Sequence, residues 1–174
     1  FGPYQQETWQ IAYNPEKLDA VETVAVFQYN RIGVEIDTLP DFYLTSAFGG
    51  RMREQVRHYT NVADAFEAMR KGEVSAVMGM RSEIDHELAK SENALFEAAG
   101  NGFPGIGKQV WDVGMAIKHT HRQLGYALEA IIDRLVKTGE MNELMASQKL
   151  RYSVPGYYRE FLDEQAIARA EGDL

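Results

Sequence analysis

The chain of 174 residues is 45% hydrophobic, which excludes a largely disordered protein and is sufficient for one domain or two small lobes. Lysine and arginine total 18 against 26 aspartates and glutamates, and a net charge of −8 without a basic stripe argues against nucleic acid binding. The absence of cysteine excludes disulfides and thiolate metal sites, and no apolar run approaches the ~20 residues of a membrane helix.

The N-terminal part of the chain alternates segments of strand and helix character. Turn residues such as Asn14-Pro15 and Gly49-Gly50 separate these segments. In chain order we expect a strand at 8–13, a segment compatible with a strand at 21–29, a strand at 31–36, a helix at 41–48 and a strand at 55–59.

The stretch VADAFEAMRKGEVSAVMG, residues 62–79, joins a short helix to a buried strand. Asn61 can cap the helix, with Asp64 in a capping-box-like position, and the apolar residues that follow have helical spacing. Gly72 follows a cationic last turn and is expected to adopt the left-handed conformation. Residues 74–78 form an almost continuous apolar run, which is typical of a strand covered on both faces. The stretch therefore predicts half of an α/β unit.

Helices dominate the expected C-terminal part. In chain order we expect a helix at 82–99, a loop at 100–107, a strand at 110–117, a helix at 122–137 that ends at Gly139, a helix at 141–149 and a tail with a polar helix at 151–174. Strands that alternate with helices predict an α/β sheet with short connections.

Motifs for enzyme chemistry are absent from the sequence. GNGFPG at 100–105 matches G-x-G-x-x-G but lacks the preceding strand and following helix of a dinucleotide site, so we expect a surface loop. His119 and His121 would diverge on a helix and have no third ligand nearby, so no metal site is predicted. No nucleophile elbow, P-loop or zinc-protease motif is present, and no carboxylate pair is singled out. We therefore predict neither an enzyme nor a cofactor.

Aromatic residues cluster near both ends of the chain, and two interpretations of them stay open. They can stack on a ligand or partner, or they can line the core where a lobe packs. The residues concerned are Tyr4, Trp9, Tyr13, Tyr157, Tyr158 and Phe161.

Taken together, these stretches resemble a known family. VADAFEAMRKGEVSAVMG is similar to the segment "ealeaLksGkvDAvv.D" of extracellular solute-binding proteins of family 3, the two-lobed receptors associated with ABC importers. FGPYQQETWQIAY, RIGVEIDTLPDFYL and WDVGMAIKHTHRQLGYALEAIIDRLVKTGEMNELMASQKL are similar to further stretches of that family, in the same order. The resemblance is spread over most of residues 1–150.

This resemblance implies an α/β fold of the two-lobed periplasmic-binding-protein type, with a ligand cleft between lobes. The second lobe would comprise residues 14–110. The first lobe would be incomplete and represented by residues 1–13 and 111–174, which include the crossing strands. No signal peptide is visible, and the abrupt opening leads us to expect missing material upstream.

The chain departs from the family at the ligand site. Amino-acid receptors of this family grip the ligand carboxylate with a Gly-Thr or Ser-Thr pair, where this chain has Asp37-Thr38, and an aspartate there repels an anionic group. The aspartate that accepts the ligand ammonium falls on Met80, and Ser75 replaces an earlier aspartate. Losing the ammonium partner removes a charge-assisted contact of ~1.5–3 kcal/mol. The resemblance thus implies that free amino acids do not bind.

One subgroup of this family is more similar to the chain in its amino-acid sequence. IGVEIDTLPDFYLTSAFGGRM and the aromatic tail look like the J-type accessory proteins encoded with periplasmic methanol dehydrogenases of methylotrophic bacteria. This implies a periplasmic accessory protein that binds a pyrroloquinoline-quinone methanol dehydrogenase, or part of it, and assists its maturation or activation without catalysis. The alternative is the receptor of an ABC importer for a small solute. The residues expected to bind the ligand or partner are Tyr4, Trp9, Asp37, Thr38, Met80, Tyr157 and Tyr158.

Overall fold

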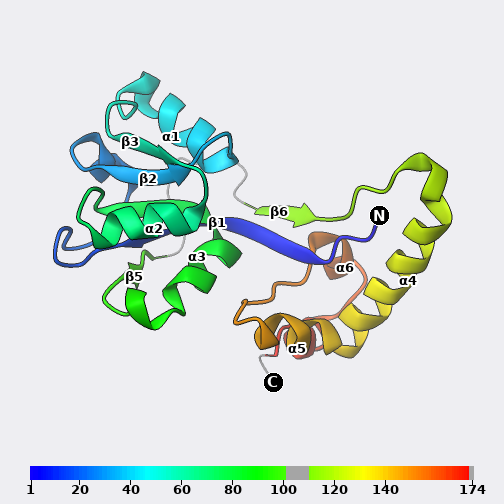
Figure 1. Ribbon diagram of the computed structural model, residues 1–174. Coiled ribbons are helices and arrows are strands. Elements are labelled where there is room, and N and C mark those ends of the chain that lie inside the picture. The colour runs from blue at the N-terminus through cyan, green and yellow to red at the C-terminus, as the bar shows by residue number, and fades with distance from the viewer. Residues whose placement is uncertain (101–109, 173–174) are drawn as a thin grey trace. The chain divides into compact units, whose positions relative to one another are not determined.

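Residues 1–100 and 110–172 are described by the computed structural model of the protein, and their contacts divide the chain into two units (Figure 1). One unit comprises Trp9–Gln109, and the other Phe1–Thr8 together with Val110–Leu174. Strand β1 (Gln5–Tyr13) contributes to both. Within the described ranges, no helix is long and apolar enough to cross a membrane.

The sheet of the Trp9–Gln109 unit has the strand order β3-β2-β4-β1-β5. Its strands are β1, β2 (Ile32–Glu35), β3 (Val56–Tyr59), β4 (Ala76–Met80) and β5 (Glu97–Ala98). Strands β2, β3 and β4 are parallel, whereas β1 is antiparallel to β4 and β5. The strands predicted at 8–13, 31–36 and 55–59 are therefore confirmed, and the strand predicted at 74–78 is shifted by two residues.

Each of the three parallel strands leads directly into a helix, as expected for an α/β sheet. These helices are α1 (Leu39–Gly50), α2 (Val62–Arg70) and α3 (Arg81–Leu88). Because successive strand residues point to opposite faces, Ile11 and Met78 enter one core of the unit while Ala12 and Val77 enter another. The sheet is thus covered on both faces.

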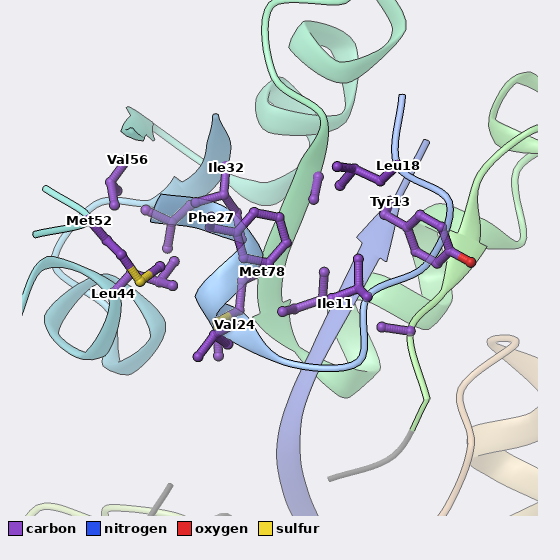
Figure 2. Packing of buried hydrophobic residues seen from close by; sticks show 14 residues of the cluster. Ile11, Tyr13, Leu18, Val24, Phe27, Ile32, Leu44, Met52, Val56 and Met78 are labelled. Atoms are coloured by element: carbon purple, nitrogen blue, oxygen red, sulfur yellow. The ribbon is translucent and has the colours of Figure 1, made fainter. Parts of the chain in front are cut away.

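The first core corrects one prediction. The segment at 21–29 is not a strand but contains a 3-10 helix, η1 (Val24–Gln28). Val24 and Phe27 are three residues apart, so both point the same way in a 3-10 helix and are buried against the sheet. Figure 2 shows their side chains in the same cluster as Leu44 and Met52. Burial of this pair thus prevailed over the strand propensity of the segment.

The second core contains the helix–strand join predicted at 62–79. The side chain of Asn61 accepts the backbone N–H of Asp64 at 2.8 Å and so caps α2. Gly72 follows α2 with a φ of +75°, and the left-handed conformation predicted for it is confirmed. Phe66 and Met69 are fully buried on the face of α2 that packs on the sheet.

The helix predicted at 82–99 is too long, because α3 ends at Leu88. Asn93 is fully buried, and its side-chain amide donates to the carbonyl of Glu87 at 2.8 Å. Its side-chain oxygen accepts a hydrogen bond of 2.6 Å from Arg70 of α2. These contacts stabilise a 3-10 turn, η2 (Ser91–Asn93), in place of further α-helix.

The other unit pairs the first half of β1 with β6 (Val110–Val113) and adds four α-helices among its described residues. These are α4 (Arg122–Thr138), α5 (Glu140–Ser147), α6 (Gly156–Arg159) and α7 (Glu164–Glu171). The predicted helices at 122–137 and 141–149 are confirmed, and Gly139 between them has a φ of +82°. The strand predicted at 110–117 ends earlier, at Val113.

A third core stabilises this second unit. Ile132 and Val136 of α4 pack with residues of the C-terminal segment, among them Tyr152, Val154 and Tyr158. The C-terminal tail is therefore an integral part of this core.

Candidate functional site

The carboxyl ends of β2, β3 and β4 meet at one edge of the sheet because these strands are parallel. Ligands of open α/β sheets bind outside such edges, near the loops that lead from strand to helix. Asp37 and Thr38 lie in the turn between β2 and α1, Met80 ends β4, and Trp9 is the antiparallel partner of Met80 on β1. The structure therefore brings these predicted residues to one edge of the sheet, which we call the carboxyl edge.

A buried carboxylate stabilises the turn between β2 and α1. Asp41, in the first turn of α1, is 6% exposed, and its Oδ2 accepts the backbone N–H of Asp37 at 3.0 Å. Its Oδ1 lies 2.9 Å from Nε2 of His58, which belongs to β3. Asp37 itself has a φ of 60°, a left-handed conformation that aspartate and asparagine adopt more readily than most residues. Asp41 thus fixes the turn from inside the protein.

Two hydrogen-bond donors of this turn are engaged within the protein. The Thr38 hydroxyl donates to the carbonyl of Glu35 at 2.7 Å, and the N–H of Asp37 donates to Asp41. Pro40, in the first turn of α1, has no N–H to offer. A helix N-terminus normally attracts an anion, but here the carboxylate of Asp41 already lies beside it. These donors are therefore not available to a ligand carboxylate.

A hollow of about 280 Å³ opens beside the turn, at the carboxyl end of β3. It is lined by Ile36, His58, Tyr59, Thr60 and Asp64. The N–H of Ile36 donates to the carbonyl of Tyr59 at 3.0 Å, so the β2–β3 ladder continues to the rim of the hollow. Burial raises the pKa of Tyr59, so its phenol is neutral at physiological pH. The hollow thus combines apolar, hydroxyl, imidazole and carboxylate groups.

Aromatic and thioether groups lie at the β4–β1 part of the carboxyl edge. The ring of Trp9 packs against Tyr43 of α1 with a centroid distance of 4.9 Å, and both are partly buried against the first core. Met80 is half-buried, and its N–H donates to Glu83 at 3.3 Å. Burial also raises the pKa of Tyr43, which therefore stays neutral. Trp9 and Met80 keep part of their surface accessible, and their binding role stays a prediction.

The remaining predicted residues belong to the other unit. Tyr158 is 2% exposed and lies in the third core, and Tyr4 packs partly buried against the same core. Because a buried phenol cannot reach a ligand or partner, the predicted binding role of Tyr158 is not retained. Tyr157 is 54% exposed, and its ring lies 5.3 Å from that of Phe161. Core packing therefore accounts for Tyr4 and Tyr158, whereas Tyr157 and Phe161 form a surface pair.

Asp112 of β6 positions this surface pair. Its Oδ1 accepts the N–H of Gly156 at 2.9 Å, and its Oδ2 accepts the N–H of Tyr157 at 3.1 Å. The side-chain amide of Gln6 donates to the same carboxylate at 3.1 Å. A carboxylate at the start of a helix is favourable because the backbone N–H groups there lack helical partners. Asp112 thus anchors α6 and places Tyr157 at the surface.

Ile36, Asp41 and His58 belong to this edge of the sheet but were not predicted from the sequence. The carboxylate of Asp41 at the third helical position has a signal in the sequence, since that position caps the start of many helices. The contact with His58 has none, because the two residues are 17 positions apart and meet only through the parallel pairing of β2 and β3.

Histidine and acidic side chains are the groups of this cysteine-free chain that could ligate a metal ion. In residues 1–100 and 110–172, no group of three or more histidine, cysteine, aspartate or glutamate side chains is arranged to bind a metal ion. His119 and His121 are exposed in a 3-10 turn, η3 (His119–His121). The GNGFPG stretch lies outside the described residues after Gly100.

Comparison with known proteins gives matches in structure only. No family model and no curated protein matches the chain. A substrate-binding protein of an amino acid ABC transporter from Streptococcus pneumoniae, bound to L-arginine, is similar with a TM-score of 0.69 and 15% identity. The match covers 84% of this chain and 59% of that protein.

Two further solved structures are similar to the chain. An ancestral arginine-binding protein bound to glutamine matches with a TM-score of 0.63 and 16% identity, over 84% of this chain and 61% of its own. A solute receptor for L-cysteine from Neisseria gonorrhoeae matches with a TM-score of 0.61 and 15% identity, over 94% of this chain and 60% of its own. The chain thus spans about three fifths of the length of each neighbour. The protein has the α/β fold of the periplasmic binding proteins, as the sequence predicted.

Proposed function

We propose that this protein is a solute-binding protein that captures a small solute and delivers it to an ABC importer, acting by binding and not by catalysis. The observation that carries the proposal is the structural likeness to substrate-binding proteins of amino acid ABC transporters, over 84% of the chain. The hollow at the carboxyl edge supports it, since small solutes bind in concavities where a few polar groups converge. Such a role implies a periplasmic location.

The proposed solute is not a free amino acid. Asp37 occupies the position at which amino-acid receptors of the family resembled have glycine or serine, and its carboxylate repels that of an amino acid. The N–H of Asp37 and the hydroxyl of Thr38 are engaged by Asp41 and Glu35, which supports the same conclusion.

A second candidate function is that of an accessory protein of a periplasmic pyrroloquinoline-quinone methanol dehydrogenase. The sequence resemblance to J-type accessory proteins favours it. The exposed pair Tyr157 and Phe161 adds a feature suited to a protein partner, because exposed aromatic residues are frequent anchors of interfaces. In this role the partner is a dehydrogenase or a part of it.

Two experiments on the full-length protein separate the candidates. A solute library is first screened by thermal unfolding and hits are measured by calorimetry, since a ligand at about 100 times its Kd stabilises by ~2.7 kcal/mol. Co-elution with a purified methanol dehydrogenase is then measured with the wild type and with Phe161→Ser. A saturable small solute without co-elution supports the receptor function. The accessory function is supported, and the receptor proposal overturned, if the wild type co-elutes with the dehydrogenase, Phe161→Ser does not, and no solute of the library stabilises the protein.

A further inference from the structure

We propose that the carboxyl edge of the Trp9–Gln109 unit binds the ammonium end of an organic amine that has an apolar body and no carboxylate beside the amine. This inference rests on the proposed solute-binding function and specifies its ligand. The exposed apolar side chains, the charge balance and the engaged donors of this edge support it.

Exposed apolar side chains lie at the turn between β2 and α1 and in the first turn of α1. Ile36, Leu39 and Phe42 are 51%, 48% and 59% exposed. Leu39 and Phe42 are three residues apart on α1 and so share a face, while Ile36 lines the hollow. Neighbouring exposed apolar side chains mark a binding surface more often than isolated ones do. This surface matches the apolar body of a ligand.

The charge balance at the same edge favours a cation. Asp37 is exposed and has no ion-pair partner in the part of the chain that the structure describes, and Asp64 lines the hollow. Asp41 is buried and paired with His58, so Asp37 and Asp64 are the carboxylates that a ligand at this turn and hollow would meet. A cation placed among them is attracted by each.

The arginines near this edge do not reverse that balance. The guanidinium of Arg57 donates to the carbonyls of Glu54 and Val56, and so points toward the amino end of β3. Arg81 begins α3 after β4, which lies on the side of β2 away from β3 and the hollow. Neither arginine lines the hollow.

The engaged donors explain why the ligand lacks a carboxylate. The N–H of Asp37 and the hydroxyl of Thr38 donate to Asp41 and Glu35, and Pro40 has no N–H. An anionic group at this turn would meet the Asp37 carboxylate without these hydrogen bonds, whereas an ammonium group would find acceptors.

The test compares matched probes by calorimetry on the full-length protein. One set is phenethylamine, L-phenylalanine and hydrocinnamate; the other is isoamylamine, L-leucine and isocaproate. In each set the amine, the amino acid and the acid share one apolar body. We expect an amine to bind, the matching amino acid to bind at least about tenfold more weakly and the acid not to bind.

A pair of variants localises the site. Asp37→Asn is expected to weaken amine binding about tenfold, and asparagine tolerates the left-handed conformation, so the turn is preserved. Asp19→Asn is the matched control, because Asp19 is exposed beyond the opposite end of the sheet. This variant is expected to bind the amine as tightly as the wild type does.

Each alternative outcome has a distinct meaning. Three outcomes overturn the inference and leave the solute-binding function intact. The first is that an amino acid or an acid binds more tightly than the matching amine, and the second is that a neutral solute binds but no amine does. The third is that both variants lose amine affinity equally. If no solute of the library or of the two sets binds, both the inference and the solute-binding function are wrong.

Discussion

Replacing Gly72 with alanine is expected to lower the free energy of unfolding by about 1 kcal/mol. Gly72 has a φ of +75° directly after α2, and its N–H donates to the carbonyl of Met69 at 3.0 Å. A Cβ added there meets no atom within 4 Å, so the cost comes from the backbone conformation alone. The left-handed conformation costs an L-residue ~1–2 kcal/mol, and the reduced freedom of the unfolded chain returns ~0.4–1 kcal/mol.

Two further substitutions control for the backbone argument. Gly72→Asn is expected to cost less than Gly72→Ala, because asparagine enters the left-handed region more readily. Gly100 also has free space around its Cβ position but no positive φ. Gly100→Ala is therefore expected to be neutral or stabilising by up to ~1 kcal/mol.

The measurement is urea unfolding followed by far-ultraviolet circular dichroism, with thermal unfolding as a second probe. For a chain of this length, a change of about 1 kcal/mol shifts Tm by ~2–4 °C. If Gly72→Ala is as stable as the wild type or more stable, with an unchanged dependence on urea, the left-handed assignment and the reasoning from it are refuted.

Two predictions concern the third core. The Tyr152 hydroxyl is buried and has no hydrogen-bond partner among the described residues. Tyr152→Phe should therefore raise the free energy of unfolding by ~1–2 kcal/mol. A lower free energy of unfolding, measured in urea, would contradict this. Burial raises the pKa of Tyr158 to about 12 and also raises that of Tyr152. Between pH 10 and 12 the unfolded state therefore loses these protons first, and stability should fall by ~1.4 kcal/mol per pH unit for each tyrosine, less steeply in Tyr152→Phe. A pH-independent stability in this range would show that neither phenol is protected.

The sequence determined those elements whose signals are local. The stretch from Asn61 to Gly72 specifies a cap, a buried helix face and a left-handed end within twelve residues, and the structure has each of them. The strand at 31–36 was equally clear, because a branched apolar segment between turn residues has few alternatives. The alternation of such units predicted an α/β sheet, and the resemblance of these stretches to a known family implied the two-lobed fold.

The candidate site was only partly determined in this way. Asp37, Thr38 and Met80 were predicted from the family resemblance, and the structure brings them to one edge because the carboxyl ends of parallel strands meet there. The contact of Asp41 with His58 and the hollow beside it were not predicted from the sequence, since each depends on the pairing of β2 with β3.

Tertiary structure also decided which aromatic and apolar residues are buried. Nothing in the sequence distinguishes Tyr157 from its neighbour Tyr158, yet one is exposed and the other lies in the third core. In the same way, Val24 and Phe27 form a 3-10 turn because the sheet offers them a core, and α3 ends at Leu88 because Asn93 binds Glu87 and Arg70. Local propensities differ by only ~1 kcal/mol per residue, so burying one large side chain, at ~1.5–3 kcal/mol, is sufficient to override them.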